Sequence, residues 1–305
     1  MDEAIGGVRG LLLRAGLNGA DLVASSLPRG LAYWLADLGG RAWYRFAPDR
    51  RRLVAQNLAR VGAATGGPVD GAALDRLVRR AFREHARYYL EILRIPHRSI
   101  EEIGRMVRID DWEHWEAVLR AGAVVSLPHI GNFEPYGSFM AAHGLRAVAP
   151  VEEIKPRELF DFLRARRASG RGVELVPLSR ARRPMLQALR DGKVVGLVAD
   201  RDLGRGGIPV TLFGHPTTLP TGPALLSLAS GRPLVAGACL RLGPERFVAW
   251  GWDIEVPLTG DRDTDAASLT VAVARRFEEA IAKAPEQWWA IFQPLWTDQQ
   301  KARGR

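Results

Sequence analysis

A histidine and a carboxylate stand close together in the stretch VVSLPHIGNFEPYG, residues 124–137. His129 follows an apolar, strand-like run, and Glu134 comes five positions later, where a short helix is expected to begin. Within one helix this spacing would point the two side chains to different faces, but from the preceding loop the histidine lies within reach of the carboxylate. That contact would fix the tautomer of the imidazole and leave its second nitrogen as a general base. A purely structural histidine is the alternative.

The residues between them favour the catalytic interpretation. Asn132 is expected to cap the helix, with Glu134 and Pro135 in its first turn, where an acidic side chain meets the positive end of the helix dipole. Strand ends are the usual place for ligand sites in open α/β sheets. The backbone N–H groups around Gly131 and Asn132 are candidates for binding the oxyanion of a tetrahedral intermediate.

A second group of charged residues follows another apolar run, in the stretch ADRDLGRGG, residues 199–207. Asp200 and Asp202 flank Arg201, and Arg205 lies in the glycine-rich loop. The pattern D-x-D is compatible with a metal and a nucleotide sugar, as in a glycosyltransferase, and also with a solvated turn. In a third interpretation a carboxylate approaches His129 and stabilises the charged imidazole, while Arg201 and Arg205 receive an anionic substrate.

Several other chemistries have no motif in this chain. There is no GxSxG elbow of a serine hydrolase, and the pair Gly192-Lys193 is followed by Val194, so a phosphate-binding Walker loop is absent. The six histidines form no HxxxH or HExxH pattern, and we expect no metal site. Cys239 is the single cysteine, which rules out an internal disulfide and indicates a reducing compartment.

Composition indicates a globular protein with a basic surface. The 305 residues are 47% apolar, enough for one large α/β domain or two small ones, and the net charge is +9. Such a balance favours polyanions, anionic lipid headgroups or phosphorylated cofactors as partners. The basic residues are spread along the chain and form no binding module with interleaved aromatic residues, which argues against nucleic acid. No signal peptide and no window of about 18 apolar residues is found, so we expect a cytosolic protein without a membrane span.

The arrangement of apolar residues predicts a helical part at 1–100 and an α/β core at 101–305 within a single domain. Up to residue 100, apolar residues recur at three- and four-residue steps, interleaved with arginines and tryptophans. These helices are expected either to pack on the body or to lie in a membrane interface. Further on, short apolar runs at 122–128, 145–151, 173–178 and 193–200 alternate with helical stretches. This alternation predicts a central, mostly parallel sheet flanked by helices.

Five blocks of sequence, in order, resemble the bacterial acyltransferase superfamily of the lysophospholipid and lipid A type. Within it, the chain is most similar to the actinobacterial branch that acylates phosphatidylinositol mannosides. In that branch aspartate is common at the acidic position that Glu134 occupies here, while the lipid A branch uses glutamate. The blocks are RRRLVAQNLARV (50–61), LPHIGNFE (127–134), ADRDLGRGGIPVTLFG (199–214), LPTGPALLSLASGRPLV (219–235) and PEQWWAIFQPLW (285–296).

The resemblance implies transfer of a long-chain acyl group from acyl-coenzyme A, a co-substrate, to a mannose hydroxyl of an anionic glycolipid, with no bound cofactor. His129 would be the base, Glu134 would orient it, and Asp200 would be the second acid that relays charge. Arg164 and Arg201 would contact phosphate groups of the lipid or the coenzyme, and an apolar tunnel would hold the acyl chain. The protein would lie peripherally on the cytoplasmic face of the cell membrane, at the inner leaflet. The alternatives are another lipid acceptor, such as a lysophospholipid or a lipid A-like sugar, and a basic membrane-binding protein without catalysis.

Overall fold

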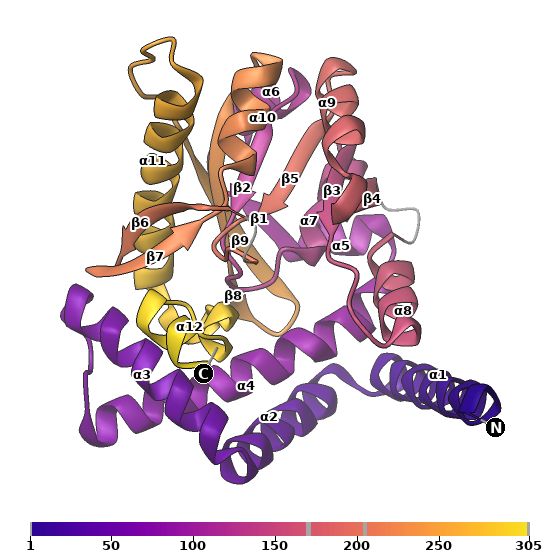
Figure 1. Cartoon of the computed structure of the whole chain (residues 1–305). Coiled ribbons are helices and arrows are strands. Elements are labelled where there is room, and N and C mark those ends of the chain that lie inside the picture. Colours follow the sequence, from indigo (N-terminus) through magenta and orange to yellow (C-terminus); the bar gives the residue numbers. More distant parts are fainter. Residues whose placement is uncertain (1, 169–171, 204–205, 304–305) are drawn as a thin grey trace.

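The computed structural model describes residues 2–168, 172–203 and 206–303 (Figure 1). Its centre is a seven-stranded sheet in the order β1-β9-β8-β2-β5-β3-β4, in which every neighbouring pair is parallel except β8 and β9. The predicted α/β class with a mostly parallel sheet is therefore confirmed. The strands are β1 (Val107–Ile109), β2 (Val124–Leu127), β3 (Ala147–Val151), β4 (Val173–Pro177), β5 (Val194–Val198), β8 (Leu234–Gly243) and β9 (Arg246–Asp253).

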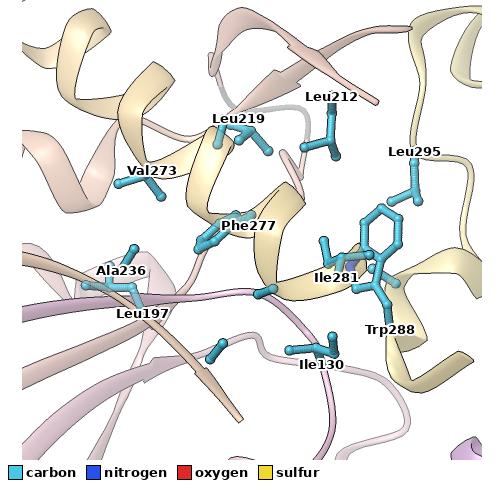
Figure 2. Close-up of a cluster of buried hydrophobic side chains, with 14 of the residues drawn as sticks. Ile130, Leu197, Leu212, Leu219, Ala236, Val273, Phe277, Ile281, Trp288 and Leu295 are labelled. Atoms are coloured by element: carbon cyan, nitrogen blue, oxygen red, sulfur yellow. The ribbon is translucent and has the colours of Figure 1, made fainter. Parts of the chain in front are cut away.

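One face of the sheet is covered by three helices and packs into the main hydrophobic core. Figure 2 shows Leu197 of β5 and Ala236 of β8 facing Phe277 of α11. The antiparallel hairpin of β6 (Ile208–Leu212) and β7 (His215–Leu219) adds Leu212 and Leu219 to the same cluster. The three helices are α9 (Arg182–Arg190), α10 (Gly222–Ser230) and α11 (Arg262–Lys283).

Other helices lie on the opposite side; in Figure 1 α6 and α7 pass behind the sheet, and α8 lies below β4. Proline and glycine set several boundaries. Pro135 lies in the first turn of α7, as expected from the sequence, and Gly231 ends α10 in a left-handed conformation. These helices are α5 (Ile100–Met106), α6 (Trp112–Arg120), α7 (Glu134–Ala142) and α8 (Arg157–Ala168).

The N-terminal part is helical, as predicted, and lies across the lower end of the sheet in Figure 1. Its residues share the main core with the C-terminal segment: Phe82 of α4 packs on Phe292, and buried Asn57 of α3 donates to the carbonyls of Ile291 and Gln293 at 2.7 and 3.0 Å. Both parts of the chain therefore contribute to one core. The helices are α1 (Asp2–Ser26), α2 (Arg29–Phe46), α3 (Pro48–Thr65) and α4 (Gly71–Arg94).

Short elements complete the chain. Pro96 lies in the 3-10 turn that follows α4. Within the described ranges, no helix combines the length and the apolar character needed to cross a bilayer. The remaining elements are η1 (Ile95–His97), η2 (Leu178–Arg180), η3 (Pro285–Gln287), η4 (Trp289–Phe292) and α12 (Thr297–Arg303).

The core predicts a large loss of stability for Phe277→Ala. Phe277 is fully buried between α11 and the sheet, so truncation leaves a cavity and should lower the free energy of unfolding by about 3–5 kcal/mol. The control is Val271→Ala on the exposed side of the same helix, expected within about 0.5 kcal/mol of the wild type. Urea titration followed by circular dichroism measures both. Equal losses in the two variants would contradict this packing.

Candidate active site

His129 and Asp200 meet at one edge of the sheet. His129 lies just beyond β2 and Asp200 just beyond β5, and these strands are parallel neighbours, so both residues emerge at the same edge. The backbone N–H of His129 donates to Oδ2 of Asp200 at 2.8 Å, and Nδ1 of the ring hydrogen-bonds Oδ1. The Asp200 side chain is completely buried, while that of His129 is 17% exposed. The pair therefore presents one nitrogen of the imidazole outward.

A tryptophan also hydrogen-bonds the buried carboxylate. Nε1 of Trp288 donates to Oδ2 of Asp200 at 2.7 Å. Burial by itself would raise the pKa of the Asp200 carboxyl, but the adjacent His129 and the hydrogen bonds from His129 and Trp288 outweigh it and lower that pKa below the ordinary value. An ionised Asp200 can only accept hydrogen bonds, so the ring proton lies on Nδ1 and Nε2 keeps its lone pair. This is the tautomer that a general base requires.

The carboxylate on Nδ1 belongs to Asp200, which corrects the expectation that Glu134 orients the ring. Glu134 is the first residue of α7, and its Oε1 accepts a hydrogen bond from the Tyr88 hydroxyl of α4 at 3.2 Å. Pairing of β2 with β5 delivers Asp200 directly beside His129, whereas the left-handed turn at Gly131 carries Glu134 toward α4. Both His129 and Glu134 still line one cavity.

The expected oxyanion donors are already engaged, which corrects a second expectation. The N–H of Gly131 donates to the carbonyl of Gln287 at 3.0 Å. The backbone of Asn132 hydrogen-bonds the Cys239 sulfur. Burial raises the pKa of Cys239, so the thiol is neutral, and it donates to the carbonyl of Ile130 at 3.1 Å. Gly131 instead serves close approach: it has φ of 60°, and a Cβ there would lie 2.3 Å from the Cys239 carbonyl oxygen.

Asn132 links the loop to a buried ion pair. Its Oδ1 accepts from the backbone N–H of Glu134 at 3.0 Å, and its Nδ2 donates to Glu91 at 2.8 Å. The N-cap of α7 is Phe133, so Asn132 lies one residue before the capping position predicted for it. Glu91 also receives two hydrogen bonds from Arg241 of β8, each 2.6 Å, and one from Tyr33 of α2 at 2.7 Å. Side chains of α2, α4 and β8 thus hold the loop that carries His129.

Sequence reasoning missed Glu91 and Arg241, although a signal exists. Both interrupt apolar runs, in YYLEILRI and GACLRLG, and a charge in such a run must be paired when the run is buried. Burial would lower the pKa of the Arg241 guanidinium, but Glu91 and Glu84 raise it above the ordinary value. Arg241 is therefore charged and compensated by the two carboxylates.

Two of the three arginines predicted to bind an anionic substrate line the cavity. Arg164 of α8 and Arg201 after β5 both line the cavity, with Arg164 exposed. Arg205 lies outside the described residues. Asp202 accepts from the N–H of Gly207 at 3.1 Å, whereas Asp200 faces His129, so the D-x-D carboxylates do not converge on one point.

An apolar cavity opens beside His129. Its volume is about 510 Å³, and its wall is formed mainly by aliphatic and aromatic side chains from the sheet face opposite α11 and from α4, α6, α7 and α8. The Trp289 ring packs edge-on against the His129 ring, with centroids 4.5 Å apart. A general base at the end of an apolar cavity suits a substrate with a long aliphatic chain.

This chain, with its mostly parallel α/β fold and its His–Asp pair beside an apolar cavity, is similar in sequence to known acyltransferases. The model of the bacterial lipid A biosynthesis acyltransferase family matches residues 15–298, and the chain belongs to this family. It is 34% identical to the phosphatidylinositol mannoside acyltransferase of Mycobacterium tuberculosis over 271 residues, 85% of this chain and 81% of that protein. It is 30% identical to the enzyme of the same name from Mycolicibacterium smegmatis over 298 residues, 88% of this chain and 95% of that protein.

The lowered pKa of Asp200 predicts a pH-dependent contribution to stability. The ionised carboxylate stabilises the native state above the unfolded-state pKa of about 3.9, and this contribution is lost as the pH falls through the lower pKa of the folded state. The difference in unfolding free energy between the wild type and Asp200→Asn should therefore narrow from pH 5 to pH 3. Urea titrations across this range measure it.

Asp202→Asn, two residues further along the same loop, is the matched control for this measurement. Its carboxylate is only partly buried, so its difference from the wild type should stay small throughout the range. A difference for Asp200→Asn that widens toward pH 3 would contradict the assignment.

Proposed function

We propose that this acyltransferase moves a long-chain acyl group from acyl-coenzyme A to a mannose hydroxyl of phosphatidylinositol mannosides. The observation that carries the proposal is that His129, paired with Asp200, lines an apolar cavity of about 510 Å³. The choice of acceptor is supported by the names of the mycobacterial relatives, because these proteins are similar to this chain over most of its length. The membership of the family supports acyl transfer to a lipid.

The proposed reaction proceeds by direct attack of the acceptor. Nε2 of His129 takes the proton from the mannose hydroxyl as its oxygen attacks the thioester carbonyl carbon. The buried carboxylate of Asp200 stabilises the imidazolium that forms. When the tetrahedral intermediate collapses, the carbon–sulfur bond breaks and the imidazolium returns the proton to the coenzyme A thiolate. The ester and free coenzyme A leave, and the enzyme regains its starting protonation state.

The donor is proposed to bind with its chain in the cavity and its phosphates outside. Aliphatic and aromatic walls exclude water from the acyl chain, whose burial contributes about 0.8 kcal/mol for each CH₂ group. Arg164 and Arg201 line the same cavity and are proposed to pair with the phosphate groups of the coenzyme. The thioester would then lie at His129, between the apolar chain and the charged head of the coenzyme.

The N-terminal helices are proposed to attach the enzyme to the cytoplasmic face of the membrane, at the inner leaflet. Tyr33 and Tyr44 of α2 point into the protein, while the other side of α1 and α2 exposes large apolar residues to solvent. Exposed arginines on the same helices suit anionic headgroups. α1 also contacts α4 and α8, which line the cavity. The exposed apolar residues are Leu12, Leu22, Val23, Leu31, Trp34, Leu35, Leu38 and Phe46, and the arginines are Arg14, Arg29, Arg41 and Arg45.

Transfer of radiolabelled palmitate from palmitoyl-coenzyme A tests the reaction. The purified full chain is offered phosphatidylinositol mono- and dimannosides, a lysophospholipid and a lipid A precursor in parallel, and label is expected on the mannosides. His129→Ala should abolish transfer, and Asp200→Asn should lower kcat about 10²–10⁴-fold because the imidazolium loses its counter-charge.

Glu134→Gln is the comparison variant, expected to lose less activity because Glu134 does not accept the hydrogen bond from Nδ1 of His129. Label on another acceptor would assign the enzyme to a different lipid with the same base. No transfer to any acceptor by folded protein would reject the proposal.

Vesicle sedimentation tests the membrane surface. Full-length protein should bind vesicles that contain phosphatidylinositol more tightly than vesicles of phosphatidylcholine alone, because the exposed arginines attract anionic headgroups. Trp34→Ser with Leu38→Ser should weaken binding at least about tenfold, since each apolar side chain contributes about 1.5 kcal/mol or more when buried. Leu258→Ser, at an exposed apolar site outside these helices, is the control and should bind like the wild type. Unchanged binding by the double variant would place the contact elsewhere.

A further inference from the structure

We propose that Gly196 determines how long an acyl chain the cavity accepts. This inference rests on the proposed function, because it assumes that the cavity beside His129 holds the acyl group of the donor. Gly196 is the central residue of β5 and lines the cavity. Its missing side chain leaves the passage to the far end open.

The cavity follows the strands away from His129. Its wall contains alternate residues of neighbouring strands, as expected when one face of a pleated sheet is exposed to it. The register divides this wall into three successive rows, and Leu127 leads directly to the loop of His129. The upper row holds Leu127 and Val198, the middle row Val125, Gly196 and Val235, and the lower row Val194 and Ala147.

Gly196 lies halfway along this path. Rows two residues apart on a strand are separated by about 7 Å, so the cavity continues by about that distance beyond Gly196 to the row of Val194. There Trp115 and Leu119 of α6 pack against Val194 and Ala147 in a small buried cluster that also lines the cavity. An aliphatic chain that enters beside His129 and runs along β2 and β5 passes Gly196 before it reaches Val194.

The space beside Gly196 distinguishes it from the other strand glycines of the wall. A Cβ on Gly237 would lie 2.8 Å from the Leu127 side chain, and one on Gly251 would lie 3.0 Å from the Trp115 ring, so packing explains both glycines. A Cβ on Gly196 would meet no atom within 4 Å, and its φ is outside the left-handed region. Neither packing nor backbone conformation requires glycine there. A ligand that lies against the strand gives the remaining reason for glycine in a strand interior.

A larger side chain at position 196 should therefore shorten the cavity without touching His129 or Asp200. The test measures kcat/KM of Gly196→Ala and Gly196→Leu with decanoyl-, lauroyl-, myristoyl-, palmitoyl- and stearoyl-coenzyme A. For Gly196→Leu we expect kcat/KM to fall at least about tenfold with palmitoyl and stearoyl donors and to remain near the wild-type value with decanoyl. Gly196→Ala should shift the preference in the same direction by a smaller amount. It provides the test if the leucine variant fails to fold.

The control is Leu197→Met, the next residue of β5, whose side chain packs in the core on the other face of the sheet. It should keep the wild-type order of donors. A folded Gly196→Leu with that same order would overturn the inference.

Thermal unfolding in the presence of each acyl-coenzyme A gives a readout that does not require transfer. If the wild type binds but does not transfer, the proposed function fails, while a loss of stabilisation by long donors in Gly196→Leu still supports the inference. If no donor of any length stabilises the wild type, both are overturned.

Discussion

The structure depends on one buried carboxylate and the groups that compensate it. The side chain of Asp200 has no exposure, and a charge in such a place is costly unless it is paired and hydrogen-bonded. Its partners come from separate parts of the chain: His129 follows β2, and Trp288 lies between α11 and η4. The carboxylate of Asp200 therefore has all these hydrogen bonds only when β2 pairs with β5 and the C-terminal segment is docked. The same contacts give His129 the tautomer of a base, so stability and chemistry share one set of hydrogen bonds.

A second buried charge joins the helical part to the active-site loop. Glu91 of α4 binds Arg241 of β8, Tyr33 of α2 and Asn132 of the loop. Loss of one partner of such a pair leaves an uncompensated charge, which typically costs about 3–5 kcal/mol. Helices α2 and α4 therefore belong to the framework of the site, and hydrogen bonds connect them to the loop that carries His129.

The two faces of the sheet have different tasks. On one face Leu197, Ala236 and Phe277 pack in the core shown in Figure 2, and on the other face Val125 and Gly196 border a cavity. A parallel sheet is normally buried on both faces. Here the second face is covered at a distance, by helices that leave space for an apolar ligand. Strands held firmly by the core can then form the wall of a binding site without closing it.

The sequence by itself determined the class of fold, the helical N-terminal part, and His129 as the candidate base, because apolar periodicity and strand-end motifs are local properties. Tertiary structure decided what lies beside that base. The local spacing favoured Glu134 as its partner and gave Asp200 as a second acid near it. Strand pairing confirms the approach of Asp200, 71 residues away, and puts it in place of Glu134 at Nδ1. It also turned the amide of Gly131 toward Gln287 and paired Glu91 with Arg241. These contacts join residues remote in the chain, and sequence spacing does not encode which strand ends become neighbours.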